Sequence, residues 1–244
     1  MEAANTYKLL SANKLKLIAA AAMFFDHFVS AFIPHNEMLN LVFRLAGRTA
    51  APVFCFFIAQ GFFYTSNLKK YILRLLVLAV ISHIPYTLCF GYSFFQATSV
   101  VWPLAMGLIA LAAVKNDKIH LIFKPVIVAA CCVLSYRANW NFIAVQWILG
   151  FGLFQGNFKK QIACFCFVGL LHLAMSFIRF GFFHETFPQW FQLGVFLALP
   201  LLALYSGKPG KKSGFMTWFF YVFYPAHLIL LFLLKQFTPL AEVF

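Results

Sequence analysis

Long apolar stretches, separated by short polar or charged segments, run along almost the whole chain. A helix needs about 20 residues to cross the hydrocarbon core of a bilayer, or somewhat fewer at the lower limit. Breaks at charge clusters, Gly and Pro divide the sequence into nine candidate spans. They are Leu15–Pro34, Leu39–Tyr64, Tyr71–Phe90, Thr98–Val114, Ile119–Ser135, Phe142–Phe154, Gln161–Phe180, Trp190–Tyr205 and Met216–Leu234.

This pattern predicts an all-α fold, a polytopic integral membrane helical bundle of about nine transmembrane helices, with eight or ten as the alternatives. We expect a single domain over residues 1–244. The sixth span is short and contains Gln146, so we expect it to be broken or partly re-entrant. The stretch Leu17–Phe25 follows basic residues, as in a signal peptide, but no small-residue cleavage site follows it, which favours an uncleaved first helix.

Composition supports a membrane protein and excludes other classes. Hydrophobic residues make up 63% of the chain and charged residues 10%, against about 45–50% and about 25% in soluble domains. A soluble protein could not hide so much apolar surface behind so few charges. The same numbers exclude a disordered chain and a disulfide-stapled secreted module. The six cysteines form no CxxC and no zinc-like spacing, so we expect buried thiols and no metal.

A net charge of +13 would indicate nucleic-acid binding in a soluble protein, but here the basic residues cluster between apolar runs. Cytoplasmic loops carry an excess of Lys and Arg, and 14 of the 19 basic residues fall at alternate connections. We therefore expect a multi-pass protein of the cell inner membrane, with a cytoplasmic N-terminus, the lipid bilayer as a partner and no nucleic acid. These 14 residues are Lys8, Lys14, Lys16, Lys69, Lys70, Arg74, Lys115, Lys118, Lys124, Lys159, Lys160, Lys208, Lys211 and Lys212.

Ionisable residues inside a bilayer cost about 2.5–3.5 kcal/mol each on insertion scales, so each one needs a reason. Asp26 is the one acidic residue within a span, and Arg44 and Arg48 lie four residues apart on one helix face. We expect Asp26 to pair with one of these arginines. The alternatives are that Arg44 extends to the membrane interface and that Arg48 forms a purely structural ion pair. For His83 and His172 the alternative is a hydrogen bond between helices.

Lys16 and His27 are eleven residues apart, which is almost three helical turns, so they share a face about 16 Å apart along the axis. A cation at the cytoplasmic edge and an imidazole deeper in the same helix suit a long, phosphate-headed substrate such as coenzyme A. The alternative for Lys16 is an ordinary anchor at the cytoplasmic interface. Near the other end of the chain, Tyr224 and His227 lie three residues apart and face one way.

Several segments resemble the TraX family. They are Lys14–Ala19, Met23–His27, Arg44–Arg48, Ala51–Phe54, Gly61–Phe62, Thr65–Asn67, Tyr71–Leu75, Ile81–Tyr86, Ala198–Lys208 and Phe219–Leu228. TraX proteins are polytopic inner-membrane proteins, and the named member is required for N-terminal acetylation of the conjugative F pilin. The spacing from Lys16 to His27 is also similar to a motif of the wider acyltransferase-3 group, in which Arg or Lys precedes His with ten residues between them. That group uses acyl-CoA donors.

The resemblance implies that His27 is the catalytic base and that Lys16 contacts the donor. We expect an integral-membrane acyltransferase that moves an acetyl group from acetyl-CoA to an amine or hydroxyl. Arg48, with Arg44, would stabilise the oxyanion or bind the acceptor. The expected catalytic residues are thus His27, Arg48 and His227, and the supporting residues are Asp26, Arg44, Tyr224 and His83.

The acceptor stays open among a protein, a peptide, a glycan and a lipid, with the pilin N-terminus as the one that the resemblance implies. The alternative function is a non-enzymatic membrane transporter or an assembly factor. The sequence also departs from the family, because Gln60 replaces the usual Glu, and His83 and Thr87 replace common acids. Asn139 and Asn141 flank Trp140 where the family has an Asp-aromatic-Gly turn.

Overall fold

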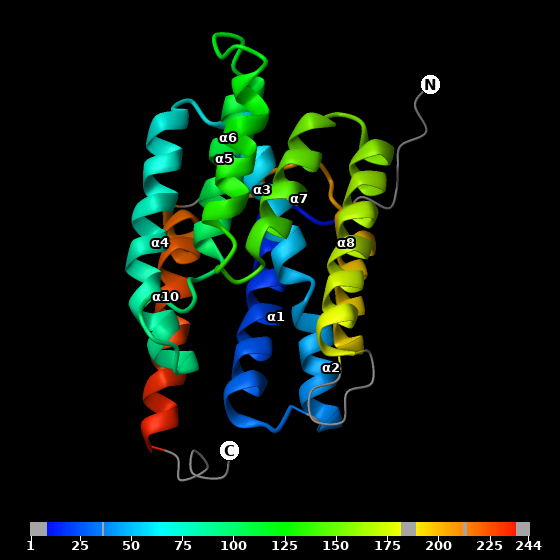
Figure 1. The fold of residues 1–244 in the computed structure, drawn as a ribbon. Helices are drawn as coiled ribbons and strands as arrows, with labels where there is room; N and C mark the ends of the chain where they lie inside the picture. The colour runs from blue at the N-terminus through cyan, green and yellow to red at the C-terminus, as the bar shows by residue number, and fades with distance from the viewer. Residues whose placement is uncertain (1–8, 36, 182–188, 212–213, 238–244) are drawn as a thin grey trace.

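A computed structural model of the chain describes residues 9–35, 37–181, 189–211 and 214–237, which form a bundle of helices (Figure 1). Within these residues the only extended pairings are two isolated bridges, Leu10 with Tyr205 and Thr98 with Ala138. The elements are α1 (Ala12–Phe32), α2 (Met38–Gly47), α3 (Ala50–Tyr64), α4 (Leu68–Phe90), α5 (Val101–Lys115), α6 (Phe123–Leu134), α7 (Asn141–Leu153), α8 (Phe158–Phe180), the 3₁₀ helix η1 (Trp190–Leu197), α9 (Ala198–Ala203) and α10 (Gly214–Phe237).

Every predicted span contains helix, so the all-α class is confirmed. Five spans in the described part of the chain are long and apolar enough to cross a membrane: α1, α2 together with α3, α4, α8 and α10. The remaining helices, α5, α6, α7 and η1 with α9, are shorter apolar segments of 10–17 residues. The chain is therefore that of a multi-pass membrane protein whose helices differ in length.

The short helices α5 and α7 lie at the centre of the bundle. Gly107 and Gly152 allow the two helices to pack closely: a Cβ atom on Gly107 would lie 2.5 Å from Ile148, and one on Gly152 would lie 2.5 Å from Leu111. The expectation that the sixth span is broken is wrong, since α7 is one continuous helix that includes Gln146. Its 13 residues are short because α7 is a buried core helix, a role that does not require the length of a bilayer.

The second predicted span divides into α2 and α3 at Arg48 and Thr49. Pro52 explains the break, because a proline has no N–H for the carbonyl of Arg48 and its ring clashes with that carbonyl in a continuous helix. The hydroxyl of Thr49 instead donates to the carbonyl of Ala46 at 2.8 Å. The eighth span likewise differs from a single α-helix, because η1 precedes α9.

The basic connections gather at one end of the bundle, which we call the basic end. Figure 1 shows the start of α4, the α5–α6 turn and the α7–α8 turn at this end, and the α1–α2 turn at the opposite end. The segment of residues 206–211 joins the start of α1, where Ala12 N–H donates to the carbonyl of Lys208 at 2.9 Å. Of the 14 basic residues counted from the sequence, Lys8 and Lys212 lie outside the described residues.

Candidate functional site

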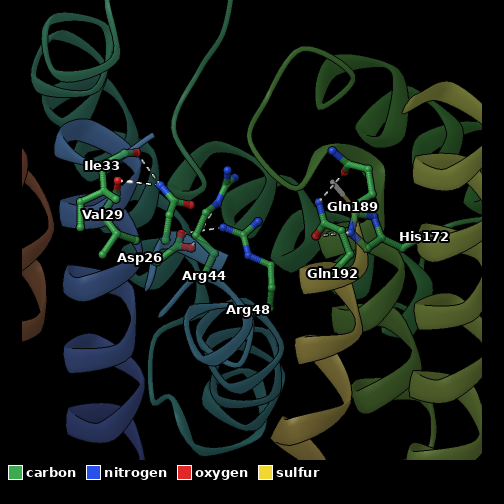
Figure 2. Close-up of polar contacts among 9 residues, drawn as sticks. Asp26, Val29, Ile33, Arg44, Arg48, His172, Gln189 and Gln192 are labelled. Carbon is green, nitrogen blue, oxygen red and sulfur yellow. Dashed lines mark hydrogen bonds and ion pairs between the residues drawn. The ribbon is translucent and has the colours of Figure 1, made fainter. Parts of the chain in front are cut away.

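Asp26 of α1 lies between two arginines (Figure 2). The Nη2 of Arg48 donates to Oδ2 of Asp26 at 2.6 Å, and the Nε of Arg44 lies 3.8 Å from Oδ1. The two arginine side chains are each 11% exposed, so Arg44 contacts the acid inside the bundle and the interface alternative is wrong for it. The predicted pairing is confirmed. One carboxylate therefore contacts two guanidinium groups.

Aromatic rings hold the two guanidinium groups. The Cζ of Arg44 lies 4.2 Å from the ring centroid of Phe191 in η1, and the Cζ of Arg48 lies 5.0 Å from that of Trp140. Such contacts stabilise a buried cation through the negative face of the ring. Trp140 has φ of +66°, a conformation that is costly for a bulky residue. The α6–α7 turn therefore holds local strain at the point where its indole covers Arg48.

His27 and His227 form a buried pair, although 200 positions separate them in the chain. The Nδ1 of His27 lies 2.9 Å from the Nε2 of His227, and the two rings are almost parallel, with an interplanar angle of 8°. Tyr224 lies against both rings, with centroid distances of 6.4 Å to His27 and 5.4 Å to His227. The structure thus brings together three residues that the sequence assigned to one pocket.

The hydrogen bonds of this pair determine which nitrogen of His27 carries the proton. The carbonyl of Phe223 can only accept, so Nδ1 of His227, 2.8 Å away, is the protonated nitrogen. Burial favours neutral rings, and in a neutral His227 the Nε2 atom is an acceptor for the Nδ1–H of His27. His27 is left with a lone pair on Nε2, which is what a general base requires.

His27 and Arg48 line the same small cavity, of about 30 Å³. Asp26, Asn139 and Trp140 also line it. The imidazole of His27, the guanidinium of Arg48 and the strained α6–α7 turn therefore meet in one place. Sequence reasoning expected the first two and missed Trp140, whose only signal was its place in the turn resembling the family motif.

A second cavity, of about 740 Å³, extends from the basic end toward the small one. Asn13, Lys16 and Lys211 line it at the basic end, and Met23 and Tyr224 line it further along α1 and α10. The remaining lining is mostly aliphatic and aromatic. Lys16 is placed as the sequence predicts, on the same helix as His27 and toward the basic end, whereas Lys211 was not predicted as a site residue.

The segment that carries Lys211 is fastened to the start of α1. The side-chain amide of Asn13 donates to the carbonyl of Lys211 at 3.0 Å, and the N–H of Asn13 donates to the carbonyl of Pro209 at 3.2 Å. The carbonyl of Pro209 satisfies a backbone donor that a helix start leaves unpaired. Gly210 has φ of +89° and passes close to Ser11, so a side chain would not fit there. The two lysines are therefore held at the mouth of one cavity.

Two predicted polar residues lie outside this site. His83, expected as a supporting residue, has its Nε2 2.8 Å from the carbonyl of Phe94 in the turn after α4 and lines neither cavity. His172 of α8 has its Nε2 3.2 Å from Oε1 of Gln192 in η1, beside Gln189 (Figure 2). The interpretation of His172 as a hydrogen-bonded residue between helices is confirmed.

Sequence reasoning missed Asn40, which joins α2 to α1. Its side-chain amide donates to the carbonyls of Val29 at 2.8 Å and Ile33 at 2.7 Å. Ile33 directly follows α1, where a helix leaves acceptors unpaired, and the carbonyl of Val29 also accepts from the N–H of Ile33 at 3.0 Å. Asn40 therefore fixes the α1–α2 turn and, through it, the register that brings Arg44 and Arg48 to Asp26. The signal in the sequence was a single amide side chain, Asn40, within an apolar run.

Comparison with known proteins decides the family. The model of the family described as TraX protein matches residues 11–235, which is most of the chain. The chain belongs to the TraX family. It is 29% identical over 238 residues to a probable fimbrial assembly protein, FimC, of Dichelobacter nodosus, covering 93% of this chain and 96% of that protein. It is 24% identical over 178 residues to an uncharacterized protein of Rickettsia prowazekii (strain Madrid E), covering 71% and 66%. No solved structure matches the chain.

Three of the departures from the usual TraX pattern lie away from the small cavity. The side-chain amides of Gln60 and Gln155 bond each other reciprocally, at 3.0 and 3.1 Å. The hydroxyl of Thr87 donates to a carbonyl of its own helix at 3.0 Å, and His83 bonds the turn after α4. Asn139 alone among them lines the cavity that holds His27. The replaced acids therefore leave the Asp26 ion pair of this TraX protein intact.

Proposed function

We propose that this TraX-family protein is an integral-membrane acyltransferase that moves an acetyl group from acetyl-CoA to an amine or hydroxyl acceptor. One observation carries the proposal: His27 and Arg48 line a small cavity that adjoins a large one extending to Lys16 and Lys211. Acyl transfer needs a base, a positive charge near the carbonyl oxygen and a path for the donor. The proposal is supported by an imidazole and a guanidinium that line one cavity, beside a larger cavity that extends to two lysines.

The large cavity fits an acyl-CoA in volume, charge and length. Ligand cavities of about 300–1,000 Å³ are usual, and this one has about 740 Å³. Lys16 and Lys211 would bind the phosphates at its mouth. The apolar walls would hold the pantetheine arm, since Lys16 and His27 are about 16 Å apart along α1. Acetyl-CoA would supply a carbonyl activated as a thioester.

His27 would act at the acceptor. Its Nε2 accepts the proton that the amine or hydroxyl loses while attacking the thioester carbonyl, and returns that proton to the departing sulfur. His227 holds the ring so that the lone pair stays on Nε2. Arg48, which lines the same cavity, would stabilise the negative charge that develops on the carbonyl oxygen. Trp140 and Asn139 close the cavity on the side of the α6–α7 turn.

The same proposal sets the orientation of the protein. Lys and Arg favour the cytoplasmic side, so the basic end would face the cytoplasm. Acetyl-CoA would then enter the large cavity from the cytoplasm. The N-terminus would then be cytoplasmic, in the inner membrane, with the nine predicted spans inside the bilayer. The acceptor would be a pilus subunit, a proposal that rests on the family and on the name of the Dichelobacter relative, a probable fimbrial assembly protein.

The test is acetyl transfer or slow thioester hydrolysis by the purified full chain in detergent, given labelled acetyl-CoA. His27→Ala should lower the rate by about 10²-fold or more, the contribution of a general base. His83→Ala is the matched control, because it removes an imidazole from α4 outside the site, and it should retain activity. Unchanged activity in His27→Ala would exclude this role.

A second candidate is a non-enzymatic assembly factor or a transporter. The relative named as a probable fimbrial assembly protein favours the former. Binding separates the candidates, because a ligand stabilises the folded state once its concentration exceeds the dissociation constant. Acetyl-CoA should raise the unfolding temperature of an acyltransferase. No shift and no turnover would favour the assembly factor.

A further inference from the structure

Four apolar side chains line both cavities: Met23 of α1, Phe54 of α3, and Val100 and Leu104 at the start of α5. The large cavity continues from them toward the basic end, and the small cavity contains His27 and Arg48. These four side chains therefore stand between the place where a donor would bind and the place where its acyl group would react.

The four side chains are packed in the bundle core. Met23, Val100 and Leu104 are each at most 8% exposed, and Phe54 packs against the core cluster. Densely packed interiors resist displacement, so a group that passes between these residues meets a passage of nearly fixed width. The residues carry no hydrogen-bonding side-chain group that would select a polar substrate, so selection here is by size.

The small cavity limits what can lie beyond this passage. Its volume is about 30 Å³, against about 740 Å³ for the large cavity. The space beside His27 therefore suits a small group. An acetyl group has three heavy atoms and a butyryl group has five. A longer chain has no room unless one of the four side chains is shortened.

We propose that Met23, Phe54, Val100 and Leu104 form a neck that determines the length of the acyl group, admitting acetyl and excluding longer chains. This inference rests on the proposed acyltransferase function and adds its specificity-determining residues. The neck has a second effect, because apolar side chains that close around the thioester exclude water from it. A shortened neck residue should therefore also raise acceptor-independent thioester hydrolysis relative to transfer.

The experiment compares acetyl-, propionyl-, butyryl- and hexanoyl-CoA as donors and as thermal stabilisers of the full chain in detergent. In the natural chain, kcat/KM should fall by about tenfold or more from acetyl to butyryl, since one methylene in a pocket changes selectivity by about 10–200-fold. Leu104→Ala should reduce that ratio by about tenfold and should extend stabilisation to butyryl-CoA.

Leu78→Ala is the matched control, because Leu78 lines the large cavity but not the small one. It should keep the selectivity of the natural chain. Val100→Ala removes less volume and is the second variant should Leu104→Ala fail to fold. Equal use of acetyl- and butyryl-CoA by the natural chain would overturn the neck while leaving the acyltransferase in place. The neck would also be overturned if the folded neck variant and Leu78→Ala had equal ratios of kcat/KM for acetyl-CoA to kcat/KM for butyryl-CoA. Absence of binding and turnover with every acyl-CoA would overturn the proposed function and the neck together.

Discussion

Gly47 of α2 lies directly against Asp26 of α1: a methyl group on Gly47 would overlap the Cβ of Asp26 and lie 2.8 Å from its Cγ. The absence of a side chain at Gly47 therefore lets the carboxylate reach Arg48. Gly47→Ala should displace Asp26, destabilise the fold by about 1–3 kcal/mol as overpacking does, and lower acetyl transfer. Thermal unfolding in detergent and the acetyl-CoA assay measure the two effects.

Gly214→Ala is the control for thermal unfolding, because a methyl group there meets no atom within 4 Å. It should leave the unfolding temperature nearly unchanged. A Gly47→Ala protein as stable and active as the natural chain would show that Asp26 tolerates displacement, and the close approach of α1 and α2 would then have no bearing on the site.

Asp26 neutralises part of the charge of Arg48. Replacing Asp26 alone should therefore lower the free energy of unfolding more than replacing Asp26 and Arg48 together. Asp26→Asn leaves two arginines facing an amide inside the bundle, and breaking a buried ion pair costs about 3–5 kcal/mol. In the double variant Asp26→Asn with Arg48→Gln, stability should partly recover, because the unpaired charge is gone. Unfolding of the two single variants and the double variant gives the coupling energy. Additive losses would contradict a direct interaction.

Much of the bundle is predictable from the sequence because burial in lipid leaves long apolar runs. The division of the second span is not, because α2 and α3 together form one stretch that is apolar and long enough to cross a membrane. Only the chemistry of Pro52, which deprives the carbonyl of Arg48 of a donor, marks the break. The length of α7 is similarly hidden, because a core helix and a spanning helix have the same apolar composition.

Within the site, the pairing of Asp26 was predictable because an acid inside a membrane has few available partners. The contact of His27 with His227 depends on how α1 and α10 pack, and a single sequence carries no record of that packing. The position of His83 was not predictable for a related reason: its partner is the carbonyl of Phe94, and a backbone acceptor leaves no signature in residue identity.

His227 is expected to act through His27 by keeping the proton on Nδ1 of that ring. His227→Gln supplies one acceptor and one donor in the same side chain, so it should retain much of the acetyl-transfer activity. His227→Phe preserves the aromatic packing but offers neither group, and it should lower kcat by about 10²-fold. The dependence of kcat on pH should change in His227→Phe and not in His227→Gln. Equal activities would assign His227 a packing role.

The reciprocal amide pair of Gln60 and Gln155 lies away from both cavities. Gln60→Glu restores the acidic residue usual in the family, and its carboxylate can still accept from the amide of Gln155. We expect acetyl transfer to stay within about twofold of the natural rate, because neither His27 nor Arg48 is contacted. A large gain in rate would show that the acid acts on the site over a distance.

Lys211 should bind the donor together with Lys16, because both lysines line the basic end of the large cavity. Charge-assisted hydrogen bonds to phosphate are about twice as strong as neutral ones. Lys16→Gln and Lys211→Gln should each raise the acetyl-CoA concentration needed for half-maximal thermal stabilisation, by about tenfold and about threefold, since Lys16 is the more buried of the two. The effect should shrink at high salt.

Lys208→Gln is the matched control, because this lysine belongs to the same segment but does not line the cavity. If Lys208→Gln weakens acetyl-CoA binding as much as Lys211→Gln does, general surface charge accounts for the effect and Lys211 makes no specific contact with the donor.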